Sequence, residues 1–169
     1  MSVHEDLPWM VVAKSILGVK EAPGPKNNPI IMEWAVVARV AKVYTADSIP
    51  WCGTTMAFVF AQLGIEPVKD PLWALNWAKF GTAIPKTKPV YGAVAVFKRK
   101  GGGHVGLVVG HDNDALHILG GNQSDAVTIT RVSKSRLVAL RWPPGMENFQ
   151  PGPVLKMTTL NQSLSINEA

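Results

Sequence analysis

The chain has 169 residues, of which 47% are hydrophobic and 17% are charged, and its formal net charge is +5. This length and composition predict one domain with a sizeable core, and they exclude a disordered protein and a coiled coil. The single cysteine excludes an intramolecular disulfide framework and a cysteine-rich zinc site. The basic net charge favours anionic partners, among which nucleic acid, membrane and bacterial cell wall all qualify.

The N-terminal sequence MSVHEDLPWMVVAKSILG has acidic residues ahead of a broken apolar segment. A secretory signal needs basic residues, a longer apolar stretch and a small-residue cleavage site. No apolar run in the chain reaches the roughly 18 residues that a membrane-spanning helix needs. We therefore expect a protein made in the cytoplasm without a Sec signal and without stable membrane insertion. The basic residues are scattered and form no dense arm, so we expect no nucleic-acid partner.

The first half of the chain has the apolar periodicity of helices, separated by loops rich in proline and asparagine. A short fourth helix is predicted after Asp70, whose side chain is expected to cap it. The predicted helices are Pro8–Leu17, Ile30–Val43, Cys52–Leu63 and the segment from Asp70 to Phe80. Four tryptophans at apolar positions are predicted to be core residues, namely Trp34, Trp73, Trp77 and Trp142.

The second half changes to short runs rich in β-branched residues, with Gly, Asn, Asp or Lys between them. These predicted strands are Tyr91–Phe97, His104–Gly110, Ala115–Leu119, Ala126–Val132 and Leu137–Trp142. Helices followed by strands predict an α+β fold in which N-terminal helices pack on an antiparallel sheet of about five strands. We expect residues 1–143 to form this domain and residues 144–169, which lose periodicity, to be a loosely ordered tail.

Cys52 stands at the predicted start of a helix, in the segment PWCGTTMAFVFAQLGI. The helix dipole and the unpaired backbone N–H groups at such a position stabilise a thiolate and are expected to lower the thiol pKa. The same N–H groups can stabilise an oxyanion when a carbonyl is attacked. The alternative is that Cys52 is a buried small hydrophobic residue, as free cysteines often are.

A cysteine nucleophile needs a histidine as its base, and His104 is the best placed because it follows three glycines and begins a strand. If the next turn centres on Asn113, antiparallel pairing places Asn122 opposite His104 on the same face of the sheet. An asparagine carbonyl there would orient the imidazole toward the thiol, as in a Cys-His-Asn triad. A one-residue bulge would change this pairing, and the alternative is that Asn122 is an ordinary turn residue.

Three segments carry a family resemblance: PWCGTTMAFVFAQLGI, YGAVAVFKRKGGGHVGLVVG and LGGNQSDAVTITRVSKSRLVALRWP. They resemble the CHAP-type (cysteine, histidine-dependent amidohydrolase/peptidase) cell-wall hydrolases, which are relatives of the NlpC-type peptidases in the papain-like superfamily. The likeness covers roughly residues 8–143 and includes the loop GVKEAPGPKNNP. Relatives often have Gly-Asp where this chain has Gly92-Ala93, so no acidic role is assigned there.

The resemblance implies a papain-like fold and a catalytic triad of Cys52 as nucleophile, His104 as base and Asn122 as orienting group. It implies cleavage of an amide bond in or next to the stem peptide of peptidoglycan, without a metal or an organic cofactor. Weaker candidates for substrate binding are Trp51, which adjoins the nucleophile, and Glu21 and Asn28, which lie in the family-like loop.

Other interpretations remain open at this point. A non-catalytic wall-binding or interaction module on the same fold would have a buried Cys52 that lies far from His104. A metallo-amidase would use His111, Asp112, Asp114 and His117, but the chain lacks a His-Glu-x-x-His helix and a clear third ligand.

The missing signal is compatible with two biological settings for a hydrolase that acts in the periplasm or cell wall. One is a phage endolysin released by a holin. The other is a secreted antibacterial effector, whose producer would need an immunity protein as a partner. We expect a monomer in either setting.

Overall fold

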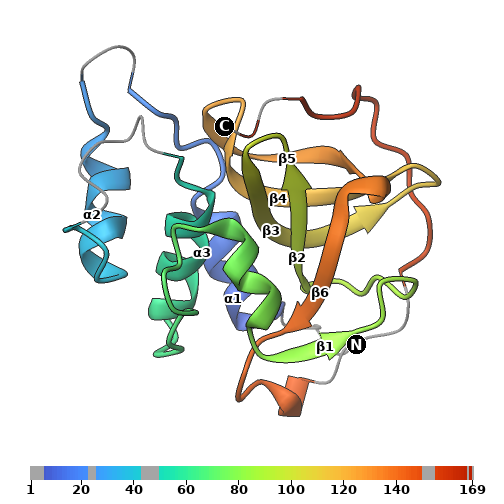
Figure 1. Cartoon of the computed structure of the whole chain (residues 1–169), viewed down its shortest axis with the longest axis horizontal. Coiled ribbons are helices and arrows are strands. Elements are labelled where there is room, and N and C mark those ends of the chain that lie inside the picture. Colours follow the sequence, from blue (N-terminus) through green and yellow to red (C-terminus); the bar gives the residue numbers. More distant parts are fainter. Residues whose placement is uncertain (1–5, 23–25, 43–49, 150–154, 167, 169) are drawn as a thin grey trace, which may run out of the picture.

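The computed structural model describes residues 6–22, 26–42, 50–149, 155–166 and 168 (Figure 1). Helices lie on one side of the molecule and a six-stranded antiparallel sheet lies on the other. The predicted α+β class is therefore confirmed. The sheet has one strand more than the five expected, because Thr82–Ile84 (β1) pairs with the last strand at one edge.

The described residues form three α-helices, which are α1 (Pro8–Ser15), α2 (Pro29–Val37) and α3 (Cys52–Ala61). Both α1 and α2 begin with a proline, whose fixed φ and missing N–H suit the first turn of a helix. Asn28 caps α2, since its side-chain oxygen accepts a hydrogen bond from the N–H of Ile30 at 2.8 Å. Among the described helices, none has the length and apolarity needed to cross a membrane.

The fourth predicted helix is a 3-10 helix, η1 (Ala74–Lys79), and the expected cap by Asp70 is wrong. Asp70 has a left-handed backbone conformation with a φ of 52°, and Trp73 occupies the position before the helix. The backbone carbonyl of Asp70, rather than its carboxylate, accepts from the N–H of Trp73 at 3.1 Å. Two further 3-10 turns are η2 (Lys134–Arg136) and η3 (Glu147–Phe149).

The sheet has the strand order β1-β6-β2-β3-β4-β5. Its remaining strands are β2 (Val94–Arg99), β3 (Gly102–His111), β4 (Ala115–Gln123), β5 (Ala126–Ser133) and β6 (Leu137–Trp142). Leu107 of β3 lies opposite Leu119 of β4, which is the register expected from a turn centred on Asn113. Nearer that turn the register shifts by one residue.

A bulge interrupts β4 beside β5. Gly120 lies opposite Thr128 whereas Gln123 lies opposite Ala126, so β4 holds one extra residue between these pairs. Asn122 adopts a left-handed conformation in this bulge, with a φ of 59°. Because an extra residue reverses the alternation of side chains, the bulge changes which side chain faces the helices.

Aromatic side chains fill the space between the helices and the sheet. Trp9 packs edge-on against Trp142 with ring centroids 5.1 Å apart, and its indole N–H donates to the carbonyl of Gly92 at 2.8 Å. Trp34 and Trp77 are also buried, as predicted. Trp73 is not a core residue, because 58% of its surface is exposed.

The C-terminal segment, residues 155–166 and 168, runs along the sheet (Figure 1). Its backbone N–H groups donate to carbonyls of the body at three points: Leu155 to Pro89 at 2.9 Å, Thr158 to His111 at 2.7 Å and Ser165 to Arg131 at 2.7 Å. Near the end of the segment, the buried carboxylate of Glu168 pairs with Arg136. Part of the predicted tail is thus hydrogen-bonded to the domain.

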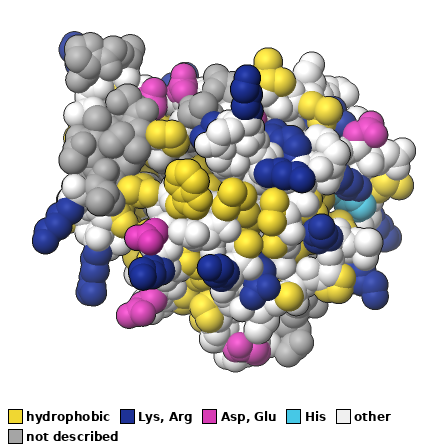
Figure 2. Space-filling view, in the orientation of Figure 1, with side chains coloured by type: hydrophobic (Ala, Val, Ile, Leu, Met, Phe, Trp, Pro, Cys, Tyr) yellow, Lys and Arg dark blue, Asp and Glu magenta, His cyan; other side chains and the backbone are white. Residues whose placement is uncertain are grey.

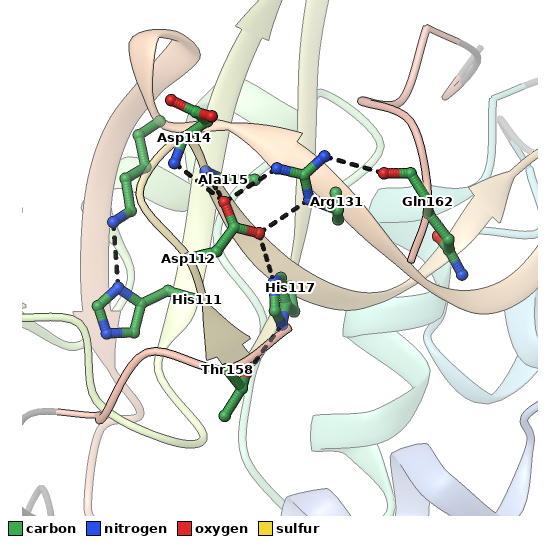
Figure 3. Close-up of polar contacts among 9 residues, drawn as sticks. His111, Asp112, Asp114, Ala115, His117, Arg131, Thr158 and Gln162 are labelled. Carbon is green, nitrogen blue, oxygen red and sulfur yellow. Dashed lines mark hydrogen bonds and ion pairs between the residues drawn. The ribbon is translucent and has the colours of Figure 1, made fainter. Parts of the chain in front are cut away.

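A polar cluster centred on Asp112 joins the β3–β4 turn to β5 (Figure 3). Arg131 donates to both carboxylate oxygens, at 2.8 and 2.9 Å, and His117 lies 2.8 Å from one of them. The Asp112 carboxylate also accepts from the N–H groups of Asp114 and Ala115. The Arg131 guanidinium holds the pKa of Asp112 well below its usual range.

Asp112→Asn should lower the melting temperature at pH 7 by roughly 2–6 °C, because the variant loses the ion pair with Arg131. A carboxylate with a depressed pKa stabilises the fold above its unfolded pKa of about 4, and this contribution is lost as the pH falls. The difference between wild type and variant should therefore shrink below pH 4 in thermal melts. Exposed Glu66→Gln is the control, and an equal loss for both variants would contradict the structural role of Asp112.

Candidate active site

Cys52 is the first residue of α3, as predicted, and only 2% of its surface is exposed. Burial raises the pKa of the thiol, although the N–H of Val105, which donates to the sulfur, acts in the opposite direction. The expectation of a lowered pKa is therefore wrong, because desolvation outweighs the helix start. Val105, whose backbone N–H influences the thiol, directly follows His104 on β3.

His104 is fully buried and its Nε2 lies 2.9 Å from the side-chain oxygen of Gln123. The amide nitrogen of Gln123 donates to the carbonyls of Ile118, at 3.0 Å, and Thr128, at 2.7 Å. Since carbonyls only accept hydrogen bonds, these two contacts fix which end of the amide faces His104. The Gln123 oxygen is therefore an acceptor, and His104 Nε2 carries the ring proton.

The other ring nitrogen of His104, Nδ1, is consequently the unprotonated one in the neutral imidazole. This atom is buried and has no hydrogen-bond partner in the described part of the chain. Burial lowers the pKa of His104 to about 4, although the bond to Gln123 acts in the opposite direction. The residue is thus a neutral base at pH 7, with its lone pair on Nδ1.

Asn122 does not make the expected contact with His104. Its side-chain nitrogen donates instead to the backbone carbonyl of Glu168 at 3.2 Å, and its side-chain oxygen is buried without a partner among the described residues. The cause is the bulge in β4, which moves Gln123 to the face on which Asn122 was expected. The sequence reasoning missed Gln123, although the glycines that precede it in GGNQS are a known signal for a bulge.

A cleft of about 620 Å³ opens beside the start of α3, with Cys52 in its lining. Its walls come from three places: the chain after α2, the segment just before η1 and the tip of the β2–β3 hairpin. Gly103 permits the tip of the hairpin to pack against η1, because a Cβ there would lie 2.7 Å from the side chain of Leu75. Of the three glycines before His104, Gly103 is thus the one that close packing requires.

The three weaker candidates for substrate binding lie outside the described lining of this cleft. Trp51 is fully buried, and its indole N–H donates to Glu21 at 3.2 Å. Trp51 therefore packs in the interior at the start of α3 and offers no exposed surface to a substrate. Asn28 caps α2 and also donates to the carbonyl of Lys20 at 2.7 Å. These contacts give Trp51 and Asn28 structural roles.

The residues proposed for a metal site lie in the polar cluster of Figure 3. Asp112 is engaged by Arg131 and His117, while His111 Nε2 bonds to the carbonyl of Leu155 at 2.7 Å. The described residues contain no group of three or more His, Cys, Asp and Glu side chains arranged to hold a metal ion. The cluster instead joins strands and the C-terminal segment.

Nuclear magnetic resonance of ¹⁵N-labelled protein should show His104 as the neutral, Nε2-protonated tautomer between pH 8 and about pH 5. Burial disfavours the imidazolium, so its titration midpoint should lie near the pKa of about 4. A His104→Gln variant identifies the signal. A proton on Nδ1, or a midpoint near the ordinary value of about 6.5, would contradict the arrangement around Gln123.

Residues 44–122 match the family model described as the CHAP domain. The matched segment contains both Cys52 and His104 and ends at Asn122, within the bulge of β4. No curated protein gives a significant match to the chain. CHAP domains are in general hydrolases of peptidoglycan that act as amidases or peptidases. Over these residues the chain is similar to the CHAP family, and its α+β architecture fits the papain-like fold of that family.

Proposed function

We propose that this protein cleaves an amide bond in or next to the stem peptide of peptidoglycan, with Cys52 as nucleophile and His104 as base. The observation that carries the proposal is the hydrogen bond between His104 and Gln123, which leaves a buried, unpartnered lone pair on Nδ1. The Cys52 thiol lies against the backbone of Val105, the residue after His104, and Cys52 also lines the open cleft. These observations support a nucleophile at a substrate-sized cleft, with the proposed base in the residue before Val105 on β3.

The reaction begins from a neutral pair, because burial raises the pKa of Cys52 and lowers that of His104. His104 Nδ1 takes the thiol proton as the sulfur attacks the amide carbonyl. The imidazolium then gives this proton to the leaving amine, and a thioester remains on Cys52. Water hydrolyses the thioester with His104 again acting as the base, which restores the thiol.

Charge that develops on the attacked carbonyl oxygen falls at the N-terminus of α3. The first backbone N–H groups of a helix have no partner within the helix, and here they belong to Cys52 and Gly53. They provide donors for the oxyanion at the positive end of the helix dipole. Gln123 keeps the imidazole in the correct tautomer during these steps, whereas Asn122 anchors Glu168 and takes no part in the proton transfer.

The proposed setting is the cell wall or periplasm, which the protein, acting as a monomer, would reach by holin release or by a specialised secretion system. As an endolysin, the protein would need no partner other than peptidoglycan. As an antibacterial effector, it would be paired with an immunity protein in the producing cell.

A non-catalytic wall-binding module is the second candidate, because Cys52 is almost fully buried and His104 is completely buried. Such a module would retain purified peptidoglycan without releasing fragments from it. A single digestion assay therefore distinguishes the two candidate functions, because only a hydrolase releases fragments.

Digestion of purified peptidoglycan should release fragments with a new amine and a new carboxylate, which mass spectrometry identifies. Cys52→Ala and His104→Ala should each lower the rate by at least about 10³-fold, since both groups take part in bond making. Circular dichroism and wall-binding assays of the same variants control for folding and for substrate association. Full activity of Cys52→Ala would overturn the proposal, and binding without release by wild type would favour the second candidate.

Gln123→Ala should lower kcat by at least about tenfold, because the imidazole loses the acceptor that fixes its tautomer. Asn122→Ala, the neighbouring amide, is the matched variant and should lower kcat much less. A thermal melt of each variant separates effects on stability from effects on kcat. The opposite order of kcat values would return the orienting role to Asn122.

A further inference from the structure

The cleft beside Cys52 carries an excess of positive charge. Three cations line it, Arg39, Lys42 and Arg99, together with one carboxylate from Asp70. Within the part of the chain that the structure describes, no carboxylate forms an ion pair with any of these three cations. A concave surface with unbalanced positive charge attracts and retains anionic ligands.

Arg99 differs from the other two cations because its side chain is held in place. It is the last residue of β2, directly opposite Gly102 at the tip of the β2–β3 hairpin. Its Nε donates to the carbonyl of Gly103 at 2.9 Å, and no described residue accepts a hydrogen bond from its two Nη atoms. The two Nη groups of a fixed guanidinium match the spacing of the two oxygens of a carboxylate.

Arg99 is also close to the reacting groups. Arg99 and Cys52 both line the cleft. The carbonyl that accepts a hydrogen bond from Arg99 Nε belongs to Gly103, which directly precedes His104. After burial, which dominates at both sites, the charge of Arg99 is among the influences on the pKa values of Cys52 and His104. An anion bound by Arg99 would therefore lie beside the amide that Cys52 attacks.

Another wall of the cleft is apolar. It is formed by Pro71, Leu72 and the exposed indole of Trp73. In the face shown in Figure 2, hydrophobic side chains gather near the middle and Lys and Arg side chains surround them. A ligand with an aliphatic part and one negative group, such as a peptide with a free carboxylate, matches these two walls.

We propose that Arg99 binds a free carboxylate on the residue next to the cleaved amide bond and so determines which peptides are cleaved. This inference rests on the proposed function, since it assigns the chemistry of the substrate at the same site. The enzyme should discriminate between a carboxylate and the neutral carboxamide of the same shape at this position. A peptide whose residue at this position carries neither a carboxylate nor a carboxamide should also be a poor substrate.

The test uses one soluble peptidoglycan fragment that wild type cleaves, synthesised in two forms. The forms differ only in the group on the residue beside the cleaved amide, which is a free carboxylate or the carboxamide. Wild type should cleave the carboxylate form with a kcat/KM about 10- to 100-fold higher, the range expected for a charge-assisted, bidentate contact. Arg99→Gln should remove this preference by slowing cleavage of the carboxylate form alone.

Arg99→Lys should retain part of the preference for the carboxylate form, because lysine keeps the positive charge but lacks the paired N–H donors of the guanidinium. Lys100→Gln is the matched control, since Lys100 is the adjacent exposed cation of the same hairpin and does not line the cleft. A variant that is merely misfolded would slow both substrate forms equally, so the ratio of the two rates reports the contact itself.

Equal cleavage of the two forms by wild type, or an unchanged preference in Arg99→Gln, would overturn the assignment of Arg99. The assignment would also fall if the cleaved bond had no carboxylate on the adjoining residue. Cys52→Ala is assayed in parallel on both forms. Cleavage that depends on Cys52 but not on Arg99 would refute this inference alone, whereas cleavage that is independent of Cys52 would refute the proposed function.

Discussion

The hydrogen bond from His104 Nε2 to the side-chain oxygen of Gln123 is the contact on which the site depends. It requires that the Gln123 amide be held by the carbonyls of Ile118 and Thr128, one from each of two adjacent strands. It also requires the extra residue in β4, without which Gln123 would face away from His104. The proton arrangement of the imidazole therefore follows from the geometry of the sheet.

The rest of the architecture buries both the thiol of Cys52 and this imidazole. Helix α3 begins at Cys52 and rests on the sheet, where Gly121 leaves room for it: a Cβ at Gly121 would lie 2.0 Å from the hydroxyl of Thr55. Burial then favours the neutral forms of Cys52 and His104. In the proposed mechanism, proton transfer accompanies attack on the substrate, and the helix N-terminus would supply the positive potential that the developing anion needs.

Much of this could be predicted from the sequence, because apolar periodicity and glycine placement are local signals. They located Cys52 at a helix start, His104 on a strand and the order of helices before strands. The identity of the orienting residue could not be predicted, since a single bulged residue decides whether Asn122 or Gln123 faces His104. The sign of the thiol pKa shift also depends on burial, which comes from tertiary packing and has no signal within PWCGTT.

The central claim is that the single thiol of this chain forms the bond to the substrate. Because Cys52 is the only cysteine, its stepwise alkylation with iodoacetamide, followed by intact-mass measurement, gives the modified fraction directly. The account predicts that the rate of fragment release from peptidoglycan falls in proportion to that fraction and reaches zero at complete modification. Unchanged release from fully alkylated protein would contradict it.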